Sequence, residues 1–339
     1  MIWTVAELIL GTLLAVMTLR DVFDTVVVPG GSHSTLHVAR RLNFALLPVW
    51  KGIRGRGRGL STMFAPFVLV ASFATWMLLL ALAFGLLAHA VGDTFTPRID
   101  SFGDAVFAAG SALVTIGESN KSVAGMGRWV VLAAGFCGLA VMTMAVTYLL
   151  EVQSSIARRD AGIFKLRTSA GDPPSAVALL EKYARIDAAD ELPRVLRDGR
   201  DWCAAVRQSH AAHPSLIYFR STGTGSGWPA ALGALLDLAL IVELWLDRPD
   251  LRGLAILLRD DGRQMAEELG RLIALRPDPS PPSDPAAGTM AAHLAAAGYL
   301  ARDGFDAEAF STEREAHSAW VRALARHLGR QEAPLLPGG

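Results

Sequence analysis

Residues 101–120 read SFGDAVFAAGSALVTIGESN, a run of small apolar residues followed by a polar segment. Residues 102–114 are small and apolar, and Ser101 with Asp104 resembles the start of a capping box. A helix over residues 102–114 would be about 20 Å long, which is too short to cross a bilayer. Gly117 then permits backbone conformations that other residues avoid. The stretch therefore predicts a short helix that ends before an irregular segment.

Long apolar segments flank this stretch. Residues 60–88 and 129–150 contain no charged side chain, and about 20 apolar residues suffice for a helix to cross the hydrocarbon core. Residues 2–19 form a weaker third candidate because they include Glu7. They do not read as a signal peptide, since no basic residue precedes the apolar run. We therefore expect three transmembrane helices, with the short helix between the second and the third.

The composition supports a membrane protein with a soluble half. Of 339 residues, 52% are hydrophobic and 19% are charged. Residues 1–150 hold ten basic and seven acidic side chains, a net charge of +3, and residues 151–339 hold 22 and 25, a net charge of −3. These values exclude a simple soluble enzyme and a disordered chain, and the lack of a basic excess argues against nucleic-acid binding. The two cysteines cannot form a disulfide framework.

Charge also predicts the orientation. The loop of residues 20–58 is rich in arginine, whereas residues 90–128 carry more acidic than basic side chains. Basic loops face the cytoplasm. We therefore expect a protein of the cell inner membrane, with its N-terminus outside and its long C-terminal half in the cytoplasm. The run GIRGRGRG at residues 52–59 is expected to contact anionic lipid headgroups. No span carries regularly spaced arginines, so a voltage sensor is not predicted.

Irregular backbone at membrane depth is tolerated where it is buried in protein or lines a water-filled cavity. Potassium-type filters use this exception: rings of backbone carbonyls replace the water shell of the ion. A short helix directs its negative C-terminal end at the cavity. One chain supplies a quarter of such a ring, so a closed assembly of four chains is required.

Residues 60–150 resemble the pore module of the potassium-channel superfamily, whose filter commonly reads Thr-Val-Gly-Tyr-Gly-Asp. The whole chain is similar to a group of bacterial potassium-channel-like membrane proteins. The motifs that carry this likeness are RDVFDTVVVP at 20–29, AGDPPSA at 170–176, and HPSLIYFRS at 213–221 followed by Trp228. The resemblance implies an all-α membrane protein with three transmembrane helices, a re-entrant pore helix with a filter loop, and an all-helical cytoplasmic domain.

The resemblance implies a selectivity filter formed by Thr115, Ile116, Gly117, Glu118, Ser119 and Asn120. Ser119 stands where the second filter glycine belongs, and a serine with a positive φ would cost about 1 kcal/mol or more. Glu118 replaces the aromatic residue, and Asn120 replaces the final aspartate. The filter chemistry resembles that of the non-selective sodium/potassium channel type, which has an acidic residue followed by Gly-Asn. We therefore expect a homotetrameric cation channel, potassium-preferring or weakly selective, with a non-conducting channel-like scaffold or sensor as the alternative.

Two glycines in the last span, Gly135 and Gly138, admit two interpretations. They are candidates for a gating hinge, and they equally suit close helix packing by small residues. The sequence does not choose between these roles.

The C-terminal half shows helical spacing throughout, with a proline-rich interruption and no alternation of strands and helices. Leu216–Phe219 is strand-like and precedes glycines at 223, 225 and 227. Their spacing differs from a dinucleotide fingerprint, so no nucleotide site is expected.

No grouping of side chains suggests catalysis, so we expect no enzyme and no cofactor beyond permeant potassium or sodium ions. The ligand or partner of the C-terminal half is not predicted. The expected divisions are 1–20 (first transmembrane helix), 21–59 (basic cytoplasmic loop), 60–150 (pore module), 151–275 (helical cytoplasmic domain), 276–289 (proline-rich linker) and 290–339 (C-terminal helices and tail).

Overall fold

A computed structural model describes residues 2–27, 38, 41–42, 45–46, 48, 64–117, 120–221, 225–278 and 287–337. Helices make up about 79% of the structure. The chain forms two compact units, Met1–Val152 and Gln153–Gly339. The long helix α6 (Gly125–Ala170) contributes residues to both units.

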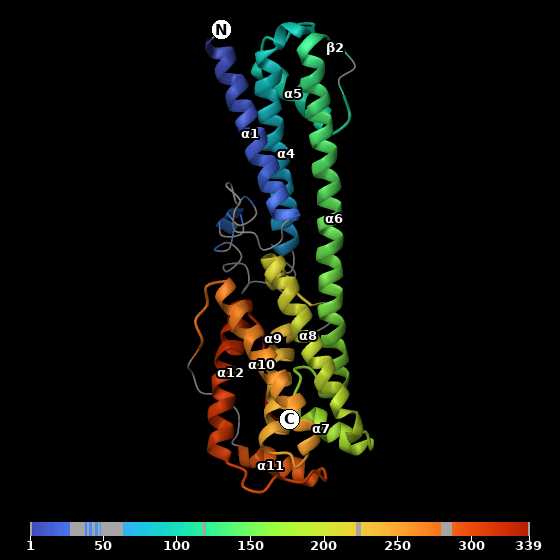
Figure 1. Ribbon diagram of the computed structural model, residues 1–339, viewed down its shortest axis with the longest axis vertical. Helices are drawn as coiled ribbons and strands as arrows, with labels where there is room; N and C mark the ends of the chain where they lie inside the picture. The colour runs from blue at the N-terminus through green and yellow to red at the C-terminus, as the bar shows by residue number, and fades with distance from the viewer. Residues whose placement is uncertain are drawn as a thin grey trace. The chain divides into compact units, whose positions relative to one another are not determined.

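The described part of the first unit consists mainly of apolar helices (Figure 1). They are α1 (Ile2–Val26), α4 (Phe64–Ala90), α5 (Phe102–Leu113) and the first part of α6. Four of the described helices are long and apolar enough to cross a membrane: α1, α4 and α6, as predicted, and α9 (Gly227–Leu244) of the second unit, which was not predicted as a span. The topology of three spans stays a prediction. Helix α1 extends to Val26, beyond the predicted end at residue 20.

The core of the first unit lies where α1, α4, α5 and α6 meet. Trp76, Leu80 and Phe84 of α4 are at most 5% exposed and pack with Leu113 of α5 and Val141 of α6. Large side chains of α4 are thereby enclosed by small and branched side chains of α1, α5 and α6. The short helix α5 is therefore an integral part of the packed unit and not a surface appendage.

A small two-stranded element closes the loops around α5. Strand β1 (Phe95–Thr96) pairs antiparallel with β2 (Ser122–Val123), with Phe95 opposite Val123 and Thr96 opposite Ser122. Phe95 is buried beside Ala105 and Ala108 of α5. The chain entering α5 and the chain leaving the segment after it are thus held together.

The second unit is built around the helix α9 (Gly227–Leu244), and 94% of the residues of this helix are buried. An all-helical domain was predicted here, and the regular secondary structure among its described residues is helical, apart from the isolated bridge between Leu246 and Ala301. The strand-like interpretation of Leu216–Phe219 was wrong, because Pro214–Tyr218 forms a 3-10 helix. The remaining helices are α7 (Ala176–Arg185), α8 (Leu192–Ala212), α10 (Pro249–Leu272), α11 (Ala287–Ala296) and α12 (Ala307–Leu328), with 3-10 turns at Ala189–Glu191 and Pro214–Tyr218.

Two charged side chains meet inside this unit. Asp237 on α9 accepts hydrogen bonds from Arg314 Nε at 2.9 Å and Nη2 at 3.0 Å, and its Oδ1 lies 3.0 Å from His317 Nε2. Burial alone would raise the pKa of Asp237, but Arg314 and His317 hold it below its ordinary value. This bidentate pair fixes α12 against the centre of the unit, because breaking it would leave an uncompensated buried charge.

Candidate functional site

The short helix α5 begins with the cap that the sequence predicts. Ser101 Oγ accepts a hydrogen bond from the backbone N–H of Asp104 at 3.1 Å, and Ser101 itself is extended. The helix ends at Leu113, one residue before the predicted end. Its 12 residues correspond to about 18 Å, so the structure confirms a helix too short to cross a bilayer.

Three N–H groups beyond α5 fold back onto its last turn. Thr115 donates to the Ala112 carbonyl at 3.0 Å, and Ile116 and Gly117 both donate to the Ser111 carbonyl, at 2.9 and 3.1 Å. Thr115 has φ = 60° and Gly117 has φ = 71°. Left-handed conformations cost threonine free energy but are readily adopted by glycine. The irregular segment predicted after this helix is therefore present, and it begins with a strained residue.

Some of the predicted filter residues lie outside the described part of the chain, and the others are exposed. Glu118 and Ser119 lie outside the described residues, so their filter roles stay predictions. Asn120 is exposed in the turn that precedes β2. Thr115, Ile116 and Gly117 are also exposed, with Ile116 at 80%. The apolar Ile116 side chain is thus largely uncovered by its own chain.

Both glycines of α6 face the end of α5, but at different distances. A Cβ atom at Gly138 would lie 1.9 Å from the Leu113 carbonyl oxygen, whereas one at Gly135 would lie 3.5 Å from the Ala112 oxygen. The first distance is impossible for any side chain without movement, and the second is ordinary contact. Gly138 therefore permits the close approach of α5 to α6. Helix α6 is continuous through both positions, and the hinge role stays a prediction.

The groups that could bind a ligand at this site are backbone carbonyl oxygens. The C-terminal carbonyls of a helix carry partial negative charge, and rings of carbonyl oxygens coordinate potassium in ion filters. No group of three or more histidine, cysteine or acidic side chains suited to a metal ion occurs within the described parts of the chain. The negative end of α5 therefore adjoins the exposed segment Thr115–Gly117, and the role of this segment as a cation filter stays a prediction.

Two polar pairs that the sequence analysis did not anticipate join α1 to α4. Asp21 Oδ2 accepts hydrogen bonds from Trp76 Nε1 at 2.7 Å and from the Val38 N–H at 3.2 Å. Toward the other end, Glu7 Oε1 lies 3.0 Å from His89 Nδ1. Ionisable residues in membrane segments pair with one another and face the interior of the bundle. The presence of Glu7 in an apolar helix is explained by this partner.

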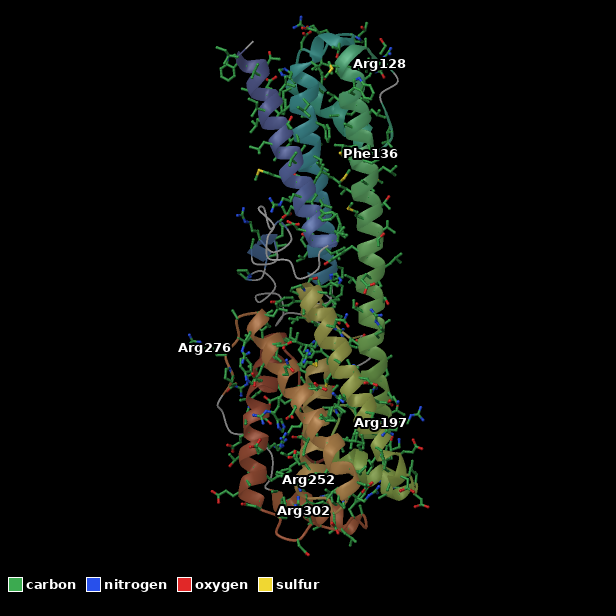
Figure 2. The ribbon with its side chains drawn as sticks, in the orientation of Figure 1. Arg128, Phe136, Arg197, Arg252, Arg276 and Arg302 are labelled. Carbon is green, nitrogen blue, oxygen red and sulfur yellow. The ribbon has the colours of Figure 1, made fainter. Side chains whose placement is uncertain are left out.

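One face of α6 in the first unit is apolar and exposed. Phe136, for example, is 72% exposed (Figure 2). Most successive members of this face are three or four residues apart, which places them along one side of a helix. The face comprises Met126, Trp129, Leu132, Phe136, Leu139, Met142, Val146, Leu149 and Leu150. A surface of this size requires lipid or another protein surface to cover it.

In the second unit, Arg159 organises the segment that carried one of the family-like motifs. This arginine is 1% exposed and donates to the carbonyls of Leu216 and Phe219, both at 3.1 Å. It also donates to Ser221 Oγ at 3.3 Å and to Asp160 Oδ1 at 3.0 Å. Burial lowers the pKa of Arg159, and Asp160 opposes that effect. Arg159 thus links residues 216–221 to α6.

No protein-family model, curated protein or solved structure matches the chain.

Proposed function

We propose that the protein is a homotetrameric cation channel of the potassium-channel type, located in the cell inner membrane. The observation that carries this proposal is the order along the chain: apolar helix α4, the capped short helix α5, the exposed segment at Thr115–Gly117, and apolar helix α6. The close approach at Gly138 locks the end of the short helix against the last span. A carbonyl-lined filter needs each of these parts.

The proposed topology has three spans, formed by α1, α4 and the first part of α6. The fourth apolar helix, α9, already has its surface covered inside the second unit, and it carries Asp237 in a buried ion pair. We therefore place α9 in a cytoplasmic domain. The basic residues of the 20–58 loop favour a cytoplasmic location, with anionic lipids as their partners; most of this loop lies outside the described residues.

Four copies would cover what one chain leaves exposed. Ile116 and the apolar face of α6 are too hydrophobic to face water. In a ring of four, the segments after α5 would meet at the axis and the α6 helices would contact neighbouring copies and lipid. We propose weak selectivity, since Glu118 and Ser119 differ from the common filter residues. Four Glu118 carboxylates near the mouth would concentrate cations.

The test combines oligomeric state with ion flux. Native mass spectrometry of the detergent-solubilised protein should give the mass of four chains. Liposomes containing the protein should then release potassium down its gradient, and sodium should compete. A monomer or dimer, with no flux of either ion, would overturn the proposal.

The alternative is a non-conducting scaffold or sensor on the same frame. Ser119 in place of a filter glycine is the feature that favours it. A Ser119→Gly variant separates the two functions in the same liposome assay. Flux only in the variant would identify a channel frame that its own filter silences, and flux in neither would support the scaffold.

A further inference from the structure

A cavity of about 70 Å³ opens inside the second unit, between α6, α7, α8 and α9. A single water molecule needs about 10–15 Å³ of such space, so the cavity accepts a small organic group. Most of its wall is apolar, formed by side chains such as Leu179, Val195 and Leu235. A few polar groups occur at one side. Small-molecule sites combine these two features.

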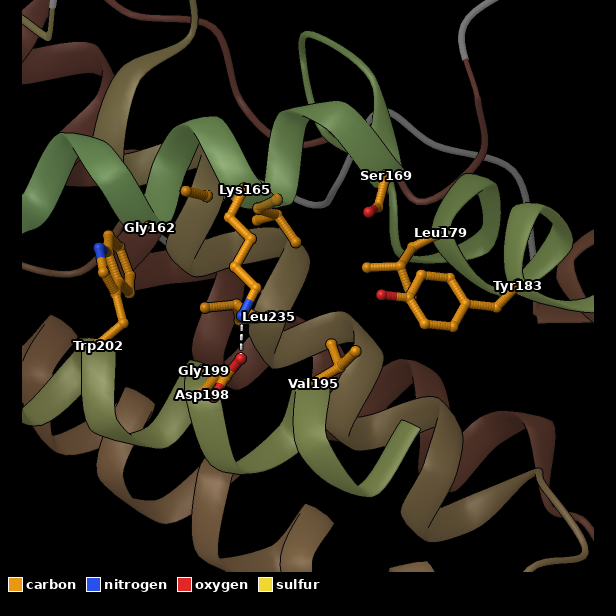
Figure 3. A pocket seen from close by; sticks show the side chains of 12 residues that line it. Gly162, Lys165, Ser169, Leu179, Tyr183, Val195, Asp198, Gly199, Trp202 and Leu235 are labelled. Carbon is orange, nitrogen blue, oxygen red and sulfur yellow. Dashed lines mark hydrogen bonds and ion pairs between the residues drawn. The ribbon is translucent and has the colours of Figure 1, made fainter. Parts of the chain in front are cut away.

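An aromatic ring held in one orientation forms one end of the wall. Trp202 Nε1 donates to the Arg159 carbonyl oxygen at 2.9 Å, which fixes the indole. The ring lies directly over Gly162 of α6, where a Cβ atom would approach Trp202 Cδ1 to 2.1 Å. The absence of a side chain at Gly162 thus lets the ring lie against α6. A rigid aromatic surface is thereby presented next to the cavity (Figure 3).

The polar side of the cavity consists of an ion pair and two hydroxyls. Lys165 of α6 reaches across to Asp198 of α8, and the two side chains are 63% and 39% exposed. Ser169 and Tyr183 direct their hydroxyls toward the same space (Figure 3). Lys165 is accordingly a cation at the mouth of an apolar cavity, and Asp198 occupies the position that an external carboxylate would take.

We propose that this cavity binds a small apolar carboxylate, of the size of a single aromatic ring bearing one carboxylate group. The ring would contact Leu179, Leu235 and Trp202. The carboxylate would replace Asp198 as the partner of Lys165. This proposal concerns the second unit alone and does not depend on ion conduction.

Binding should act on α6, because Gly162, Lys165 and Ser169 all belong to this helix. A ligand that contacts α6, α7 and α8 together stabilises their packing by mass action. Backbone amides of residues 162–169 should therefore exchange with deuterium more slowly when the ligand is present.

The probes are benzoate, toluene and acetate, added to the full-length protein in detergent. Benzoate carries both the ring and the charge, toluene only the ring, and acetate only the charge. Saturation-transfer NMR detects binding, and hydrogen exchange of residues 162–169 locates it. We expect benzoate to bind more tightly than either of the other two and to protect these amides.

Charge variants on the partly exposed mouth test the assignment without disturbing the core. Lys165→Met should weaken benzoate binding about three- to tenfold, which is the range of a partly solvated charge-assisted contact, and should leave toluene unchanged. Asp198→Asn should strengthen benzoate binding, because it removes the internal competitor. Arg276→Met, which removes an exposed positive charge beyond the end of α10, is the matched control and should have no effect.

Several results would overturn the proposal. They are no benzoate signal in the native protein, protection that leaves residues 162–169 unaffected, or equal loss of benzoate binding in Lys165→Met and Arg276→Met. Val195→Trp, which fills the cavity, should abolish the benzoate and toluene signals together. Persistence of either signal in a folded Val195→Trp protein would place the binding elsewhere.

Discussion

Trp76 Nε1 donates a 2.7 Å hydrogen bond to Asp21 Oδ2, and both side chains are at most 1% exposed. The two residues lie on α4 and α1, 55 positions apart in the chain. A buried carboxylate is expensive unless its oxygens are hydrogen-bonded. The indole is therefore one of the groups that permit Asp21 inside the apolar bundle, and the pair fixes the position of α1 against α4.

Trp76→Phe removes this donor while keeping an aromatic ring. We expect the free energy of unfolding to fall by about 1–3 kcal/mol, because Asp21 loses a buried hydrogen bond. Thermal unfolding of the protein in detergent measures the change. Trp3→Phe is the matched control, since Trp3 is 83% exposed on α1 and should be neutral. Equal midpoints for the two variants would refute this role of Trp76.

Alanine at the two glycines of α6 should have unequal effects. Gly138→Ala forces α5 away from α6, and we expect a loss of about 1–3 kcal/mol, the usual range for overpacking. Gly135→Ala introduces only ordinary contact with Ala112 and should be tolerated. Thermal stability and potassium flux of both variants are the measurements. Reduced flux in a stable Gly135→Ala protein would indicate that Gly135 acts as a hinge. A Gly138→Ala protein as stable as the native one would contradict the close packing of α5 against Gly138.

Arg159 should be irreplaceable even by lysine. A lysine side chain at this position would keep the charge but would lack the forked donors that reach the backbone of residues 216–219. We expect Arg159→Lys to reduce the stability of the second unit by about 1–3 kcal/mol, because buried acceptors lose their donors. Arg158→Lys, one residue away and exposed, serves as the comparison. Chemical unfolding followed by tryptophan fluorescence distinguishes them, and similar curves for the two variants would argue against the anchoring role.

Stability should fall in mild acid because of His210. Burial, together with repulsion from Arg159, lowers the pKa of this imidazole from 6.5 to about 3, against the opposing hydrogen bond to the Val206 carbonyl. Protonation therefore favours the unfolded state: the stability from neutral His210 is fully present above about pH 6.5 and is lost progressively toward pH 3.

Between pH 7 and pH 5 this single group should account for about 2 kcal/mol of lost unfolding free energy. His210→Phe should flatten the pH dependence by that amount. His293→Gln, which alters an exposed histidine paired with Glu181, is the control. An identical pH dependence in the native and His210→Phe proteins would show that His210 is not buried in its neutral form.

The sequence predicts the helices of the first unit well because their signals are local. The apolar run of α4, the Ser101 cap and the short length of α5 are all visible within a few residues. Leu216–Phe219 was misjudged because a short apolar run fits a strand or a helical turn equally well. The pairs Asp21–Trp76 and Lys165–Asp198 join residues that are 55 and 33 positions apart, and no local pattern links them. The cavity likewise exists only after four helices have assembled.

The most direct test of the channel proposal is recording from the purified native protein in a planar lipid bilayer, with potassium chloride on one side and sodium chloride on the other. We expect discrete current steps with a reversal potential that is near zero or modestly displaced toward the potassium equilibrium potential. Replacement of chloride by a large anion should leave that potential unchanged. Currents that follow chloride, or no steps from a verified tetramer, would contradict the proposal that the segment after α5 forms a cation filter.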